Sequence, residues 1–180
     1  LLRLGLPTVI DEAYYELGEG GSLSYLIQEF PNAIVLRTFS KAFGLAGLRV
    51  GYALGHGSVI KLLTRVKVPW NVPAVSIAAA SAALDDMADF DARVAELKTA
   101  RDELGRGLSR MPGVVAIPSE GNFILVDISH TRMSADRMVQ ALLAEGVLIR
   151  SLGAHHAEKS YVRVTVGTRD QNARCLAAAE

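Results

Sequence analysis

The chain has 180 residues, half of them hydrophobic, and its 19 Lys and Arg balance 19 Asp and Glu to a formal net charge of zero. This composition excludes collagen-like and intrinsically disordered classes, and it disfavours a nucleic-acid partner, which would need many unopposed cations. The single Cys175 cannot form an internal disulfide and no apolar run approaches the roughly 20 residues of a membrane span, so we expect a cytoplasmic globular protein without a membrane partner.

The first third of the sequence predicts two strands joined by a helix. Residues 7–10 form a short β-branched run that ends at Asp11, and residues 33–38 form a second such run. Between them, apolar residues recur at helical spacing over 22–30. This order predicts a βαβ unit with parallel strands, and ligands of such sheets bind beyond the carboxyl ends of the strands.

The next segment predicts a third strand over 49–54 and a helix over 58–66 with Ser58 as its N-cap. An Ala-rich helix is expected over 73–84, and acidic residues then interrupt the apolar pattern. We therefore expect a domain junction here, with residues 1–86 in one domain and 87–180 in a second.

The second half predicts another α/β layer. A long amphipathic helix is expected from residue 90 to about 108. Strands and one helix follow it in alternation: strands over 114–117, 122–128, 147–150 and 161–166, and a helix over 134–145.

The candidate chemistry centres on Lys41, which lies 30 residues after Asp11 and just beyond the second predicted strand. Phe39, Phe43 and Leu45 surround it in sequence. Such neighbours are expected to desolvate the amine, lower its pKa and favour the neutral form that attacks a carbonyl carbon.

Two further groups of residues suit a phosphorylated pyridine cofactor. The hydroxyls of Thr38 and Ser40, with the guanidinium of Arg49, suit a phosphate monoester. A carboxylate is needed to keep the ring nitrogen protonated, and a hydroxyl is needed for the phenolic oxygen. Asp11 and Tyr14 meet these needs, with Tyr15 as a competitor for the role of Tyr14.

Four segments carry a resemblance to a known family. They are VIDEAY at 9–14, RTFSKAFGLAGLRVG at 37–51, NF at 122–123 and YVRVTVGT at 161–168. In this order and spacing the chain resembles the second half of a pyridoxal-phosphate aminotransferase of fold type I, most like the histidinol-phosphate aminotransferases. Roughly the first half of the usual family chain, including a loop that caps the cofactor phosphate, is absent from this sequence.

The resemblance implies a role for each candidate residue. Lys41 would hold pyridoxal 5'-phosphate covalently and then shuttle a proton, Asp11 would pair with the ring nitrogen, and Tyr14 would bind the phenolic oxygen. Thr38, Ser40 and Arg49 would hold the phosphate. Arg163, and with it Arg150, would bind the anionic end of the substrate.

The resemblance also implies the architecture and the reaction. Residues 1–86 would belong to the large cofactor domain, a mostly parallel sheet with helices on both faces, and 87–180 would form the small C-terminal domain. The full-length protein would be a homodimer that transfers an amino group from a small-molecule donor, histidinol phosphate, to a 2-oxo acid, 2-oxoglutarate, in histidine biosynthesis.

Several alternatives stay open. An aromatic amino acid aminotransferase and a phosphothreonine-type decarboxylase share the reactive lysine, and a catalytically incomplete fragment without a cofactor site is the non-enzymatic alternative. Arg163 alone also fits an edge-strand arginine that faces water. The pair His155-His156 lacks further ligands at zinc spacing, so no metal site is expected, and Cys175 suits a small apolar filler.

Overall fold

The computed structural model describes residues 1–154 and 160–180, so the pair His155-His156 lies outside the described residues. The chain divides into two compact units, Leu1–Ala92 and Arg93–Glu180. The predicted junction after residue 86 falls at the start of helix α4 (Met87–Leu108), and the first turn of α4 belongs to the first unit. Within the described ranges, no helix is long and apolar enough to cross a membrane.

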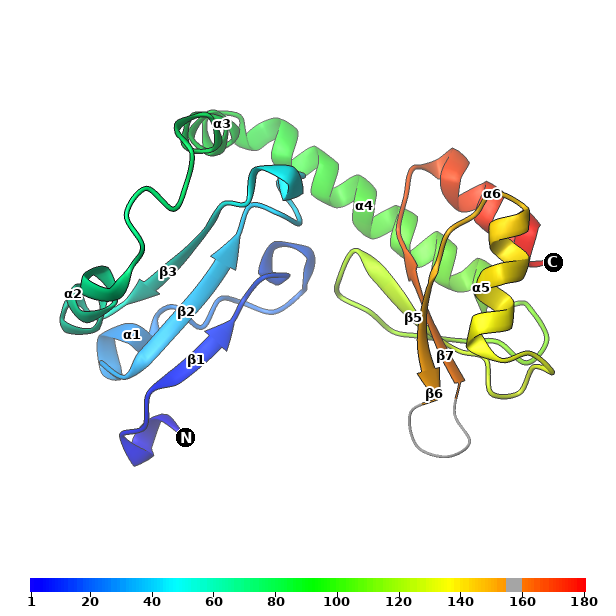
Figure 1. The fold of residues 1–180 in the computed structure, drawn as a ribbon, viewed down its shortest axis with the longest axis horizontal. Helices are drawn as coiled ribbons and strands as arrows, with labels where there is room; N and C mark the ends of the chain where they lie inside the picture. The colour runs from blue at the N-terminus through cyan, green and yellow to red at the C-terminus, as the bar shows by residue number, and fades with distance from the viewer. Residues whose placement is uncertain (155–159) are drawn as a thin grey trace. The chain divides into compact units, whose positions relative to one another are not determined.

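The first unit contains a three-stranded sheet in the order β1-β2-β3, as Figure 1 shows. Strand β1 (Thr8–Asp11) pairs in parallel with β2 (Ala33–Thr38), and the short helix α1 (Leu26–Glu29) lies between them in sequence. This confirms the predicted βαβ unit. Two 3₁₀ turns, Leu2–Leu4 and Tyr15–Leu17, flank β1.

Strand β3 (Gly51–Gly55) runs antiparallel to β2, so the sheet is mixed and not mostly parallel. The cause lies in the segment that joins the two strands, which contains only the 3₁₀ turn Ala46–Leu48 and no crossover helix. Phe39 N–H donates to Val50 O at 3.0 Å, directly beyond the last strand pair. The segment is therefore a wide hairpin loop, and it carries Lys41.

Helices α2 (Gly57–Val66) and α3 (Ala74–Asp85) confirm the predicted helices of this region. The N-cap of α2 is His56 and not Ser58, because the imidazole accepts from Ser58 N–H. The segment between the helices holds Trp70, which is 94% exposed and has a positive φ of 52°. Both helices also expose large apolar side chains, among them Leu62, Val66, Val75, Ile77 and Leu84.

The second unit contains a four-stranded antiparallel sheet in the order β4-β5-β7-β6. Its strands are β4 (Val115–Ile117), β5 (Phe123–Asp127), β6 (Arg150–Ala154) and β7 (Ser160–Thr165), and its later helices are α5 (Ala135–Ala144) and α6 (Arg169–Ala179). The predicted strand over 147–150 was placed too early, since β6 begins at Arg150.

One apolar core holds the second unit together. It combines residues of α4, α5 and α6 with the inward residues of β5 and β7. Its most deeply buried members are Leu104, Val126, Ile128 and Val162, each at most 1% exposed. Cys175 is also in this core, which confirms the predicted filler role, and burial raises the pKa of its thiol.

Candidate functional site

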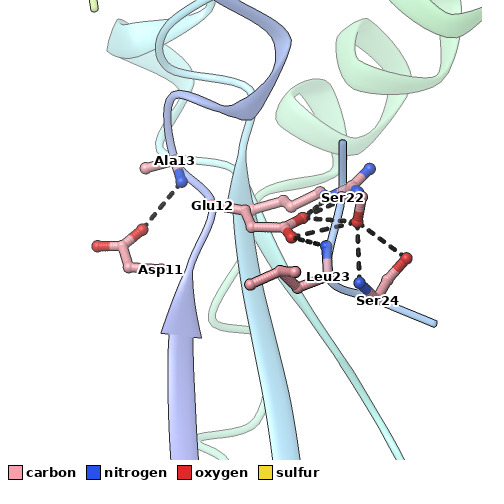
Figure 2. A network of polar contacts seen from close by, with 7 residues as sticks. Asp11, Glu12, Ala13, Ser22, Leu23 and Ser24 are labelled. Carbon is pink, nitrogen blue, oxygen red and sulfur yellow. Dashed lines mark hydrogen bonds and ion pairs between the residues drawn. The ribbon is translucent and has the colours of Figure 1, made fainter. Parts of the chain in front are cut away.

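The carboxyl ends of β1 and β2 bring two candidate residues to the same edge of the sheet. Asp11 is the last residue of β1 and pairs with Leu36, two positions before Thr38 at the end of β2. The side chain of Asp11 is exposed, and its Oδ1 accepts from Ala13 N–H at 2.9 Å, as Figure 2 shows. This turn directs the chain from Asp11 toward Tyr14.

Tyr14 and Lys41 lie close together. Lys41 Nζ is 5.0 Å from the centroid of the Tyr14 ring, a distance at which the ammonium is attracted by the ring. Tyr15, the competitor for the role of Tyr14, instead packs its ring against Arg37, whose Cζ lies 4.2 Å from the ring centroid. The geometry therefore favours Tyr14 over Tyr15 as the tyrosine of a site built around Lys41.

The loop that carries Lys41 is fixed by an aromatic cluster and by its own backbone. Phe39 and Phe43 are buried with their ring centroids 4.7 Å apart, and Phe43 stacks on Phe90 at 4.3 Å. Gly44 N–H donates to Lys41 O at 3.0 Å in a turn where Gly44 has a φ of +71°. Lys41 itself is half-buried in this loop.

The three predicted phosphate ligands, Thr38, Ser40 and Arg49, lie at the end of β2 and in the loop that follows it, and they differ in their hydrogen bonds. Thr38 Oγ1 accepts from Ser40 N–H at 3.1 Å and lies 3.2 Å from Val50 O, to which it donates. Thr38 therefore shapes the loop beneath Ser40. Arg49 is exposed and donates from its guanidinium to Ala46 O at 2.8 Å, with a left-handed backbone φ of 56°.

This donor set fits the chemistry of pyridoxal phosphate. Lys41 offers an amine for an aldehyde, Asp11 a carboxylate for a ring nitrogen, and Tyr14 a hydroxyl for a phenolic oxygen. Ser40 and Arg49 add a hydroxyl and a cation for a phosphate. All five side chains are exposed or half-buried in the first unit.

In the second unit, Arg150 and Arg163 stand directly opposite each other on β6 and β7. Strand β7 lies between β5 and β6, so the alternative of an edge-strand arginine is wrong for Arg163. The guanidinium of Arg163 lies 5.3 Å from the Phe123 ring, and its buried Nε has no hydrogen-bond partner among the described residues. Like charges opposite each other and an unpaired buried donor are both unfavourable, and an anion bound between the arginines would relieve both.

Sequence reasoning missed a buried ionic network behind the strand ends. Glu12 is 8% exposed, and its Oε1 accepts from Leu23 N–H at 2.6 Å. Its Oε2 accepts from Ser22 Oγ at 2.9 Å and from Arg37 Nε at 3.0 Å (Figure 2). Sequence position was the one feature that could have indicated this network, because Glu12 directly follows Asp11 and Arg37 directly precedes Thr38.

The network shifts the titration of Glu12. Burial alone would raise the pKa of Glu12, but hydrogen bonds from Leu23 and Ser22, with the hydrogen bond and charge of Arg37, outweigh it and lower the pKa below the ordinary 4.5. Glu16 behaves oppositely, because burial raises its pKa and its Oε2 has no hydrogen-bond partner among the described residues.

A Glu12→Gln variant is expected to be less stable than the unsubstituted chain by about 1.5–3 kcal/mol at neutral pH, since it loses a charge-assisted hydrogen bond. A lowered folded pKa gives stability that is present above 4.5 and is lost as the pH falls through the folded pKa. The difference between the two proteins should therefore shrink in acid, as measured by denaturant unfolding across pH. The exposed Glu29→Gln is the control, and a difference that persists unchanged in acid would contradict the expectation.

Comparison with known proteins places these features in one family. The model of aminotransferase class I and II matches residues 2–179. Histidinol-phosphate aminotransferase of Anaeromyxobacter sp. is 42% identical over 94% of this chain and 46% of its own length. Histidinol-phosphate aminotransferase 2 of Pseudomonas aeruginosa is 44% identical over 94% and 46%. The chain thus spans about half the length of the curated relatives it matches.

Solved structures agree with the sequence relatives. Histidinol-phosphate aminotransferase of Sinorhizobium meliloti, in complex with pyridoxal-5'-phosphate, is 27% identical with a TM-score of 0.80, over 95% of this chain and 47% of that one. L-threonine-O-3-phosphate decarboxylase of Porphyromonas gingivalis is also 27% identical, with a TM-score of 0.82 over 96% and 53%. The family match over residues 2–179 and the matched fold together establish that the chain belongs to the class I and II aminotransferases.

Proposed function

We propose that the chain is the part of a pyridoxal-phosphate-dependent aminotransferase that carries the reactive lysine, and that the whole enzyme converts histidinol phosphate with 2-oxoglutarate. The observation that carries the proposal is the approach of Lys41 Nζ to the Tyr14 ring at the strand ends marked by Asp11. The relatives from Anaeromyxobacter and Pseudomonas support the choice of histidinol phosphate.

Each candidate residue of the first unit has a separate role in this proposal. Bound pyridoxal phosphate supplies an aldehyde and a ring that withdraws electrons. Lys41 Nζ attaches the cofactor and later holds the proton taken from the substrate α-carbon. Asp11 keeps a proton on the ring nitrogen, Tyr14 donates to the phenolic oxygen, and Ser40 and Arg49 bind the phosphate. Thr38 contributes by holding the Ser40 backbone.

In the second unit, Arg163 and Arg150 bind the anionic end of either substrate. Histidinol phosphate carries a phosphate and 2-oxoglutarate carries carboxylates, so one pair of guanidiniums serves both half-reactions. The opposed arrangement of the arginines supports this assignment, because an anion between them offsets their mutual repulsion. A homodimer of the full-length protein completes the site in this proposal.

The test is to mix the purified chain with pyridoxal phosphate, reduce the product with borohydride and map the labelled peptide. Label on Lys41 supports the proposal, and a chain without a label at Lys41 contradicts it. Glutamate formed from 2-oxoglutarate is then measured with histidinol phosphate and with aromatic amino acids as donors. Turnover of aromatic donors alone would replace the proposed substrate, and label without any turnover would favour the incomplete fragment.

A phosphothreonine decarboxylase is the second candidate, favoured by the fold match to the decarboxylase of Porphyromonas gingivalis. It shares the phosphorylated amino substrate and differs in the bond that breaks at the α-carbon. Release of carbon dioxide from phosphothreonine, without glutamate formation, would decide for this candidate.

An Arg163→Ala variant is expected to raise the KM for histidinol phosphate roughly 10- to 150-fold, with a smaller effect on kcat. The reason is the loss of a charge-assisted interaction of about 1.5–3 kcal/mol with the substrate anion. Initial rates at varied substrate concentration provide the measurement. The exposed Arg169→Ala in α6 is the matched control, and an Arg163→Ala enzyme with an unchanged KM would move the anion site elsewhere.

A further inference from the structure

The buried network behind the strand ends connects four segments of the first unit. We call the side chains of Glu12, Ser22 and Arg37, with the ring of Tyr15, the strand-end clamp. Arg37 forms an ion pair with Glu12 Oε2 at 2.9 Å and donates from its Nη2 to Ser22 Oγ at 2.6 Å. The guanidinium also lies over the Tyr15 ring, with Cζ 4.2 Å from the ring centroid. The clamp therefore links the end of β1, the turn after it, the loop at 22–24 and β2.

Each charged or aromatic member of the clamp is the sequence neighbour of a proposed cofactor residue. Glu12 follows Asp11, Tyr15 follows Tyr14, and Arg37 precedes Thr38. Successive side chains of a strand point to opposite faces, which places Arg37 and Thr38 on opposite faces of β2. Figure 2 shows this for Asp11 and Glu12, whose side chains leave the chain in opposite directions.

The side chain of Asp11 has fewer contacts than the side chain of Glu12. Among the described contacts, the Asp11 carboxylate accepts one hydrogen bond, from the neighbouring Ala13 N–H, while its backbone pairs with Leu36 in the sheet. Glu12, by contrast, is anchored through its backbone, with Glu12 N–H donating to Leu36 O at 2.9 Å, and through both oxygens of its carboxylate. Glu12 is therefore firmly held through both backbone and side chain, directly next to Asp11 in sequence.

We propose that Glu12 and Arg37 are positioning residues that set the placement of Asp11, Tyr14 and Thr38 for cofactor binding. The inference rests on the proposed function. The planar guanidinium of Arg37 suits this task, because its fork fixes direction as well as distance between two strands. A buried ion pair is weak evidence for stability alone, and its best-supported use is to specify one arrangement over others.

The test compares Glu12→Ala with Val35→Ala, a control that removes fully buried methyl groups two residues from Arg37 in the same strand. The first readout needs no cofactor: the amide NMR signals of Ala13 and Tyr14 in the unloaded chain. The second is the Kd for pyridoxal phosphate by absorbance titration. Glu12→Ala is expected to shift both amide signals and to raise the Kd at least tenfold. Val35→Ala is expected to lower the Tm while leaving both signals in place and the Kd within about twofold.

Two further variants keep the test decisive if Glu12→Ala fails to fold. Ser22→Ala removes the hydrogen bonds of the Ser22 hydroxyl with Glu12 and Arg37 and keeps the ion pair, and Arg37→Lys keeps the charge and loses the fork. Both substitutions lie far in sequence from Ala13 and Tyr14, so a shift of these amide signals reports the loss of clamp contacts and not the exchange of a sequence neighbour. Both are expected to move the amide signals and the Kd in the same direction by smaller amounts. Unmoved amide signals in all clamp variants, or equal Kd changes in clamp and Val35→Ala chains of matched Tm, would overturn the proposal.

The amide readout separates this inference from the proposed function. A chain that binds no pyridoxal phosphate contradicts the proposed function and removes the Kd comparison. The amide signals of Ala13 and Tyr14 still show whether Glu12 and Arg37 set this edge, and unmoved signals would overturn the positioning role by themselves.

Discussion

A Lys41→Ala chain is expected to lose all covalent attachment of pyridoxal phosphate and to keep its fold. The loop around Lys41 is held by Phe39, Phe43 and backbone hydrogen bonds, none of which uses the lysine amine. The contact of the amine with the Tyr14 ring contributes only about 0.5–1 kcal/mol at an exposed site. Mass spectrometry after borohydride reduction measures the attachment, and thermal unfolding followed by circular dichroism measures the fold.

Lys67 provides the matched control for this experiment. It lies in the same unit, is exposed, and donates to Asn71 Oδ1 at 2.9 Å. Lys67→Ala should retain the label in full. A Lys41→Ala chain that still yields a specific reduced adduct at the same stoichiometry would refute the assignment of Lys41.

A Leu104→Ala chain is expected to be less stable by about 2–5 kcal/mol, because the substitution opens a cavity in a packed core. Leu104 is 1% exposed and projects from α4 into the core of the second unit, among residues of β5, β7 and α6. Both residues favour helix, so the cost comes from packing and not from helix propensity. Denaturant unfolding, followed separately for each unit, gives the free-energy difference.

The control is the same substitution at the exposed Leu143 of α5, which lies at the surface. Leu143→Ala should change the stability by a few tenths of a kcal/mol, within the range of surface substitutions. Equal losses for the two variants would mean that Leu104 does not lie in a closed core.

Hydrophobic patterning predicted most helices and strands, because burial imposes their periods directly on the sequence. Hydrophobic patterning did not predict the direction of β3, because the segment 39–50 is long enough either for a crossover to a parallel strand or for a turn to an antiparallel one. The antiparallel arrangement follows from the pairing of β2 with β3 across the sheet, which the hydrogen bond from Phe39 to Val50 continues into the loop. Likewise the run 147–150 is apolar because Ile149 packs into the core just before β6 begins.

The candidate site was predictable where it follows from strand order. Asp11 and Thr38 share one edge of the sheet because β1 and β2 are parallel and end there, and Lys41 lies near Tyr14 just beyond these ends. The pairing of Arg150 with Arg163 depends on the register of β6 and β7, which no local pattern encodes. The clamp was missed because buried charges are recognised only through their partners, and Glu12 and Arg37 lie 25 residues apart.

The exposed loop between α2 and α3 gives this chain a built-in optical probe. Trp70 is the only tryptophan in the sequence, so all indole fluorescence originates from this one position in the first unit. A solvated indole emits at long wavelength, and any polypeptide that covers the loop would shift the emission toward the blue. Association of any polypeptide that covers this loop is therefore measurable on the unlabelled chain.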